Sequence, residues 1–257
     1  MISTFIIKLI AMISMTLDHV AVAFSLSEVF RFIGRLAFPL YALMLAETLA
    51  YFKTQEKERQ NRYLLSLFVL AVLSEAAYDY ALLDGGFWDN SGANQVLQFF
   101  LYACFSLKAG KLPPVQKYAA LILVVCLCSY FHIGYYGAGM LYLFLLERYV
   151  SVREGMTKEQ RLKESFVLTV NFLLMMSVEE FILYLPYLKY HGLYRYSGIV
   201  LKTYFADFVN SGIFLSIPLI ALKNPAYKKG NPLFQSIYHY YYPLHLWILT
   251  ILRYSLH

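Results

Sequence analysis

Charged residues are scarce in this chain of 257 residues: Asp, Glu, Lys and Arg make up 15%, whereas hydrophobic residues make up 60%. Soluble domains carry roughly a quarter charged residues, so this composition disfavours a soluble globule, a nucleic-acid-binding module and a dinucleotide-binding dehydrogenase. The net charge of +6 does not restore a nucleic-acid partner, because Lys and Arg gather in the cytoplasmic loops of membrane proteins. The composition therefore indicates an integral membrane protein.

Cysteine is also rare, with Cys104, Cys126 and Cys128 in apolar runs and no CxxC pair. This pattern predicts small, buried core residues rather than a disulfide or metal framework. The sequence also lacks an HExxH motif, a His pair spaced by four residues, a GxSxG elbow and a Walker loop. We therefore expect no metal site.

Long apolar runs are what the chain does contain, and a transmembrane helix needs about twenty such residues. The runs predict an all-α, polytopic transmembrane helix bundle of about nine spans (eight to ten), forming a single domain over residues 1–257. The predicted spans lie near 4–24, 30–52, 63–82, 95–108, 116–131, 135–150, 165–187, 198–222 and 233–254.

Basic residues follow every second predicted span, in the segments 53–62, 108–117, 148–163 and 223–229. The intervening segment 84–92 carries Asp84 and Asp89 and no Lys or Arg. Since basic loops stay in the cytoplasm, we expect the amino terminus inside and the carboxyl terminus outside.

Ionisable residues inside predicted spans are the main functional candidates, because they are costly in lipid unless they pair or line a wet cavity. Lys8 and His19 are eleven residues apart, which returns nearly to the same helix face and separates them by roughly 16 Å. Asp18 lies about 100° around the helix from His19, so a carboxylate on another helix would orient the ring better. A catalytic imidazole, a proton relay and a helix–helix hydrogen bond all remain open for His19.

A second group of charges lies toward the predicted outer ends of two spans, where Arg31 and Arg35 face Glu75 and Asp79 at similar depth. Each pair has the four-residue spacing of a shared helix face. Gly34 and Pro39 predict a close approach and a bend beside Arg35. The four charges predict a buried network, with a structural clamp between helices as the alternative role. His245, in the last span, is interpreted as a core histidine or a site residue.

Several of these residues together resemble the TraX family. The resemblance rests on Lys8 to Asp18-His19, Arg31-Phe-Ile-Gly34-Arg35-Leu-Ala-Phe-Pro39, Ser74-Glu75, Tyr78-Asp79, Asn94, Gly134 to Gly139 and Tyr242-Pro243-Leu-His245-Leu. It covers nearly the whole chain. The family resemblance implies a membrane-embedded acetyltransferase, because the founding member acetylates the pilin amino terminus in a bacterial inner membrane. It also implies a relation to integral-membrane acyltransferases in which a basic residue precedes the essential histidine by eleven positions.

The resemblance implies His19 as the catalytic base and acetyl-CoA from the cytosol as the acyl donor, with no metal. Asp18 and Arg35 are the further catalytic candidates. Arg31 or Arg35 is expected to stabilise the oxyanion, and Glu75 or Asp79 to orient the imidazole. The expected substrate- and CoA-binding residues are Lys8, Arg31, Glu75, Asp79, Asn94, Tyr136 and His245.

The expected partners are the lipid bilayer, acetyl-CoA and an acceptor that is a pilin-like peptide, a glycan or a lipid, with no nucleic acid. The expected location is the bacterial inner (plasma) membrane. Two other functions fit the same buried charges: a small secondary transporter or proton-coupled permease, and a non-catalytic factor for assembly of a surface appendage. Loss of acetyl-CoA turnover in a His19→Ala variant distinguishes the enzyme from both.

Overall fold

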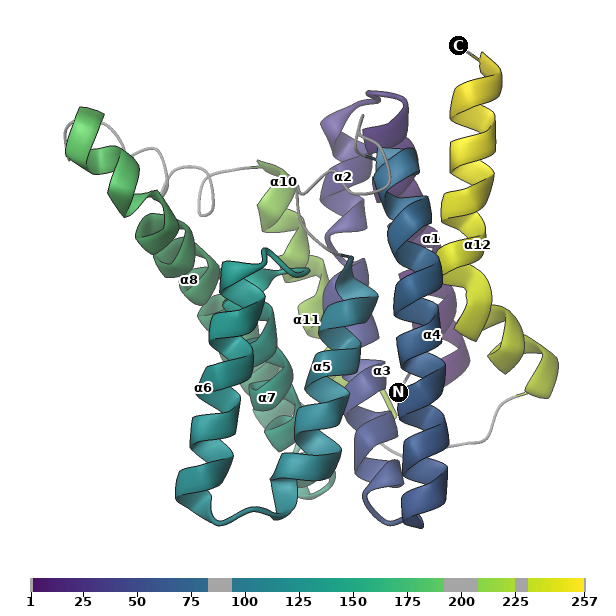
Figure 1. Cartoon of the computed structure of the whole chain (residues 1–257). Coiled ribbons are helices and arrows are strands. Elements are labelled where there is room, and N and C mark those ends of the chain that lie inside the picture. Colours follow the sequence, from purple (N-terminus) through teal and green to yellow (C-terminus); the bar gives the residue numbers. More distant parts are fainter. Residues whose placement is uncertain (1, 83–93, 192–207, 225–230, 257) are drawn as a thin grey trace.

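Helices form nearly all of the secondary structure in the computed structural model, which describes residues 2–82, 94–191, 208–224 and 231–256 (Figure 1). Within these ranges, β pairing is limited to a bridge between Ile2 and Lys223. The predicted all-α class is therefore confirmed. Residues 198–207 of the predicted span 198–222 lie outside the described residues.

The bend predicted beside Arg35 is present in the structure. The amino-terminal helices are α1 (Thr4–Ala23), α2 (Glu28–Gly34) and α3 (Ala37–Phe52). Pro39 lies in the first turn of α3 and cannot donate a backbone hydrogen bond to Arg35, so the helix is interrupted there. Gly34 ends α2 against α1, where an added Cβ would lie 2.3 Å from Cβ of Asp18. Both predicted roles, the bend and the close approach, are borne out.

The middle of the chain forms a series of antiparallel helices. These are α4 (Lys57–Leu82), α5 (Gln95–Lys108), α6 (Pro114–Tyr130) and α7 (Tyr136–Val152). The tight turn between α6 and α7 places His132, Gly134 and Tyr136 at positive φ. Glycine adopts this conformation without strain, so Gly134 suits the turn.

The remaining helices are α8 (Lys158–His191), α10 (Phe208–Ser211), α11 (Ser216–Leu222) and α12 (Pro232–Leu256). Pro243 lies inside α12 and removes one donor from its hydrogen-bond ladder. In Figure 1, α12 bends along its length and its carboxyl end lies at the top of the bundle.

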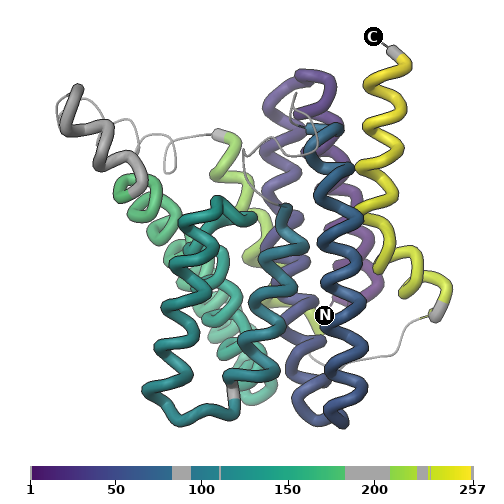
Figure 2. The backbone as a smooth tube through the Cα atoms, viewed as in Figure 1, coloured from purple at the N-terminus to yellow at the C-terminus, as the bar shows by residue number. Residues whose placement is uncertain are grey.

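The two ends of the sequence meet inside the bundle. α1 packs against α2, α3, α4 and α12, and α12 runs along α4 (Figure 2). On the other side, α7 contacts α3, α6 and α8, and α11 lies against α8 and α3. The largest hydrophobic cluster joins these groups through fully buried side chains such as Leu40, Leu43, Met140 and Phe172.

Length and apolar composition mark four described helices as candidate membrane spans: Thr4–Ala23, Glu28–Phe52, Lys57–Leu82 and Lys158–Ile182. Pro114–Tyr130 and Val209–Leu222 are shorter apolar helices. Large apolar side chains such as Leu65, Ile122 and Ile251 are exposed on the sides of the bundle, as expected where lipid is the solvent. The chain is a helical membrane protein; the count of nine spans remains a prediction.

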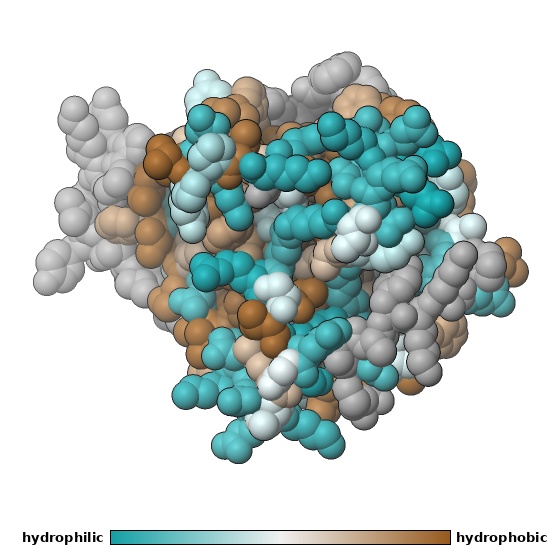
Figure 3. All heavy atoms as spheres, turned by 90° about the horizontal axis from the view of Figure 1, so that it is seen from below, coloured by the Kyte–Doolittle hydropathy of each residue, from teal (hydrophilic) through white to brown (hydrophobic). Residues whose placement is uncertain are grey.

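Hydrophilic side chains gather at the lower end of the bundle, seen from below in Figure 3. The connections α3–α4, α5–α6 and α7–α8, which carry the basic segments, lie at this end (Figure 1). Their clustering agrees with the predicted alternation of loops, whereas the cytoplasmic assignment of this end remains a prediction.

Buried ion pairs hold the helices together near the same end. Glu47 of α3 pairs with Arg153, which follows α7, and with Nζ of Lys223, which follows α11, at 2.5 Å. An exposed lysine, Lys53, also pairs with Glu147 of α7. Because a buried charge without its partner is strongly destabilising, the two pairs of Glu47 fix α3 against the ends of α7 and α11.

The cysteines fit their predicted role only in part. Cys128 is buried and Cys104 is partly buried, but Cys126 is exposed on the surface of α6. The prediction of a buried core position is therefore wrong for Cys126, because an apolar run in a membrane helix also faces lipid.

Candidate active site

His19 and His245 form a buried pair between α1 and α12. Nδ1 of His19 lies 2.7 Å from Nε2 of His245, and the two rings are inclined by only 6° to each other. His19 is 6% exposed and His245 is 4% exposed. The predicted partner of His19 was a carboxylate, Glu75 or Asp79; the structure instead brings it a second histidine from the other end of the chain.

The backbone of α12 holds His245 from the side opposite His19. Nδ1 of His245 lies 2.8 Å from the carbonyl oxygen of Tyr241, one turn earlier. The hydroxyl of Tyr241 lies 2.6 Å from Oγ1 of Thr16 on α1. The ring of Tyr242 meets both imidazoles edge-on, with centroids 5.9 Å from His19 and 5.6 Å from His245.

His19 lines a small cavity of about 50 Å³, which we call the His19 cavity. Its walls come from α1, α3, α5 and α12 together with Gly34 and Tyr135. Six of its twelve lining residues carry polar side chains. They are Asp18, His19, Tyr41, Gln95, Tyr135 and Tyr242.

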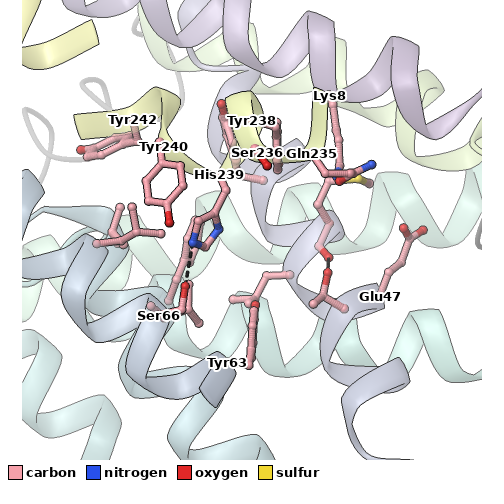
Figure 4. Close-up of a pocket in the computed structure, with 18 of the residues that line it drawn as sticks. Lys8, Glu47, Tyr63, Ser66, Gln235, Ser236, Tyr238, His239, Tyr240 and Tyr242 are labelled. Carbon is pink, nitrogen blue, oxygen red and sulfur yellow. Dashed lines mark hydrogen bonds between the residues drawn. The ribbon is translucent and has the colours of Figure 1, made fainter. Parts of the chain in front are cut away.

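A larger cavity of about 570 Å³, the Lys8 cavity, lies among α1, α3, α4, α5 and α12 (Figure 4). Lys8, Glu47, Tyr63, Ser66, Gln235, Tyr238 and His239 are among its lining residues. Nζ of Lys8 donates to Gln235 and lies 4.2 Å from the centre of the Tyr238 ring. Nε2 of His239 lies 2.7 Å from Oγ of Ser66, the contact marked by a dashed line in Figure 4.

The two cavities share four lining residues: Tyr41, Val96, Phe99 and Tyr242. Lys8 and His19 therefore lie at opposite ends of adjoining cavities along one helix, roughly 16 Å apart by helical rise. The Tyr41 hydroxyl is buried at the junction and has no hydrogen-bond partner among the described residues. A buried polar group of this kind is unusual in a folded protein and fits a site that receives a polar ligand.

Asp18, Arg31 and Arg35 lie beside the His19 cavity. Asp18 lines it and is 3.9 Å from Nε of Arg31. Nη1 of Arg35 donates to the hydroxyl of Tyr135 at 3.3 Å, and Tyr135 also lines the cavity. An arginine that donates to a tyrosine oxygen leaves the phenolic O–H able to donate to something else.

The model of the family described as TraX protein matches residues 3–253. The chain belongs to the TraX family. Comparison with curated proteins and with solved structures finds no match. The family resemblance seen in the sequence is therefore confirmed over nearly the whole chain.

In this TraX family member, the contacts of Arg31 and Glu75 differ from the predicted network of two arginines with Glu75 and Asp79. Arg31 pairs with Asp18 on α1, and Glu75 accepts hydrogen bonds from the backbone and side-chain amides of Asn94. Asp79 is buried on α4. The helix break after Gly34 turns α2 toward α1, so that Arg31 reaches Asp18.

Asn94 is the N-cap of α5. Its Oδ1 accepts from the backbone N–H groups of Val96 and Leu97, at 2.8 and 3.1 Å, and its amide donates to the carbonyl of Ala71. These bonds use both ends of the side chain in joining α5 to α4. Asn94, predicted as a binding residue, and its partner Glu75 line neither the His19 cavity nor the Lys8 cavity.

Tyr135 takes the place that the sequence analysis gave to Tyr136. Tyr135 lines the His19 cavity, whereas Tyr136 does not and places its ring edge-on to His132. Tyr136 has a positive φ at the start of α7, so its side chain points in a different direction from that of Tyr135. Sequence alone did not distinguish two adjacent tyrosines in a turn.

Other cavity residues that sequence reasoning missed are Tyr41, Gln95, Tyr63, Gln235 and Tyr238. The high tyrosine content, 24 residues, was the available signal, but it did not identify positions. Within the described residues, no group of three or more His, Cys, Asp or Glu side chains could hold a metal ion.

Proposed function

We propose that the protein is an acetyltransferase of the bacterial inner membrane that transfers acetyl from cytosolic acetyl-CoA to an amine or hydroxyl of a membrane or cell-surface acceptor. His19 is the general base. The observation that carries the proposal is the placement of a buried imidazole on the wall of a cavity that adjoins a larger, lysine-bearing one. Membership of the TraX family supports the same reaction, since pilin acetylation is the activity that the resemblance implies.

The Lys8 cavity fits the donor in size and chemistry. Its volume of about 570 Å³ is within the range of about 300–1,000 Å³ usual for small-molecule sites. Lys8 supplies a cation for a phosphate, and Tyr63 and Tyr238 contribute aromatic side chains to the wall. The pantetheine arm would pass Tyr41, whose unpartnered hydroxyl lies between the two cavities. In this arrangement the thioester reaches His19 from the Lys8 side.

The proposed reaction conserves atoms and charge. Nε2 of His19 removes the proton of the acceptor N–H or O–H while the acceptor attacks the thioester carbonyl carbon. The tetrahedral intermediate collapses with cleavage of the C–S bond, and the leaving thiolate takes the proton from His19. The products are the acetylated acceptor and free CoA, and the imidazole is again neutral.

Tyr135 is the donor that we assign to the oxyanion. It lines the His19 cavity, and Arg35 donates to its oxygen at 3.3 Å. The guanidinium makes the phenolic O–H a stronger donor, so Arg35 acts on the oxyanion through Tyr135. A preorganised donor in a dry site is typically worth about 100- to 1,000-fold in turnover.

The proposal is tested with purified protein in lipid nanodiscs supplied with acetyl-CoA labelled in the acetyl group. Wild type should release free CoA and transfer label to membrane extract containing peptide, glycan and lipid acceptors. His19→Ala should lose both activities by about 100- to 10,000-fold, the usual contribution of a general base. Equal rates in the two proteins would rule out the proposed role of His19.

A secondary transporter is the second candidate, favoured by one observation. The helix break between α2 and α3, at Gly34 to Ala37, and Pro243 in α12 both lie beside the buried histidines, and interrupted helices at a buried site are typical of transporters. Solute uptake into proteoliposomes that persists in His19→Ala, without any CoA release by wild type, would favour transport. If neither activity is found, the appendage-assembly role becomes the better explanation.

A further inference from the structure

The hydrogen-bond chain through α12 determines which nitrogen of each histidine carries the proton. The carbonyl oxygen of Tyr241 can only accept, so Nδ1 of His245, at 2.8 Å, must carry hydrogen. In a neutral ring Nε2 then has only a lone pair. Because Nε2 of His245 lies 2.7 Å from Nδ1 of His19, Nδ1 of His19 must be the donor.

The same logic leaves Nε2 of His19 without a proton. We propose that His245 is a positioning residue that holds His19 in the Nδ1–H tautomer, with its basic Nε2 available to the His19 cavity. The consequence for acetyl transfer rests on the proposed function above, whereas the tautomer follows from the two hydrogen bonds alone. His245 thus takes the role that a carboxylate or carbonyl has beside many catalytic histidines.

Aromatic packing restrains the pair in this geometry. Tyr242 meets both imidazole rings edge-on, and the ring of Tyr241 stacks on His245 with centroids 5.2 Å apart. The bond from Tyr241 to Thr16, at 2.6 Å, ties this part of α12 to α1, which carries His19. Both imidazoles therefore have a fixed orientation before any substrate enters, as preorganisation requires.

His245 also has a role once His19 accepts a proton. The imidazolium donates more strongly through Nδ1–H, and the lone pair of His245 Nε2 receives this charge-assisted bond. The neutral acceptor stabilises the imidazolium less than a carboxylate would. The proton on Nε2 thus stays easily transferable to the leaving thiolate.

The tautomer is measured directly by nitrogen NMR of protein labelled with ¹⁵N-histidine in nanodiscs, with His19 assigned through His19→Gln. We expect the Nδ1–H form of His19 in wild type and in His245→Gln, whose side-chain oxygen replaces the accepting nitrogen. His245→Leu removes the acceptor and should give a mixture with the Nε2–H form. A predominant Nε2–H form of His19 in wild type would overturn the inference.

Turnover supplies the second readout. His245→Leu should lower kcat for acetyl transfer by about 10- to 100-fold, the usual cost of losing an orienting partner, with KM for acetyl-CoA unchanged. His245→Gln should recover most of the loss. Leu244→Ala, on the exposed side of α12 one residue earlier, is the matched control and should retain wild-type activity. Equal kcat values for His245→Leu and His245→Gln would contradict a positioning role.

Failure of the two proposals can be told apart. If His19→Ala keeps full transfer activity, the proposed function fails, and the NMR signal still decides the tautomer. If His19→Ala is inactive but His19 has the wrong tautomer in wild type, the enzyme proposal stands and the role of His245 falls. Size-exclusion profiles and helical circular dichroism of each variant show whether the protein is folded.

Discussion

Two buried polar clusters of this bundle look alike in the sequence and differ in the structure. Asn94 and Glu75 join α5 to α4, and Asn94 uses its side-chain oxygen and its amide in capping and bridging. His19 and His245 join α1 to α12 but use only one nitrogen of His19, and His19 lines a cavity. A buried polar residue in a membrane bundle is thus a functional candidate when an atom remains free after its structural bonds are made.

Tyr135→Phe should have the largest effect among three tests of this comparison. It removes the phenolic donor on the wall of the His19 cavity, so kcat should fall by about 100-fold while KM for acetyl-CoA stays the same. The measurement is steady-state CoA release. Tyr136→Phe separates the structural assignment from the sequence prediction: if Tyr136→Phe is the impaired variant, Tyr135 is not the donor.

Lys8→Met should raise KM for acetyl-CoA by about 10- to 100-fold, since a hydrogen bond to a charged group is worth about 1.5–3 kcal/mol. Its kcat should change little, because Lys8 lies in the Lys8 cavity, at the far end from His19. Lys8→Arg keeps the charge and should remain near wild type. The check is the concentration dependence of CoA release, and a drop in kcat with KM unaltered would place Lys8 in the chemistry instead.

Asn94→Ala should affect stability rather than chemistry. It removes the N-cap of α5 and the side-chain amide that donates to Glu75, a loss of about 1–3 kcal/mol. The backbone N–H of residue 94 still donates to Glu75 in this variant. Thermal unfolding in nanodiscs should show a lower Tm, and CoA release per folded molecule should equal that of wild type. A folded Asn94→Ala protein with impaired turnover would mean that this cluster takes part in the reaction.

Much of the fold was predictable because apolar runs in lipid have few structural choices. The described helices follow the predicted spans, and Gly34 and Pro39 marked the break after α2 through their own backbone properties. Asn94 directly before an apolar run is an N-cap signal, which favours a structural role over the predicted binding role. Recognising it would have placed Glu75 and Asn94 in the structural cluster.

The candidate site was harder to predict. Lys8 and His19 share a helix, so their spacing was visible, but His245 lies 226 residues after His19. No local pattern reports a contact over that distance, and a carboxylate is the commoner partner of a catalytic histidine. The choice between Tyr135 and Tyr136 depended on a positive φ at one position of a turn, which the residue types did not indicate.

The most direct test of the account is the rate at which folded protein releases CoA from acetyl-CoA, compared among wild type, His19→Gln and Asn94→Ala. The account predicts similar rates for wild type and Asn94→Ala and a rate at least about 100-fold lower for His19→Gln. A folded His19→Gln protein that releases CoA as fast as wild type would contradict it.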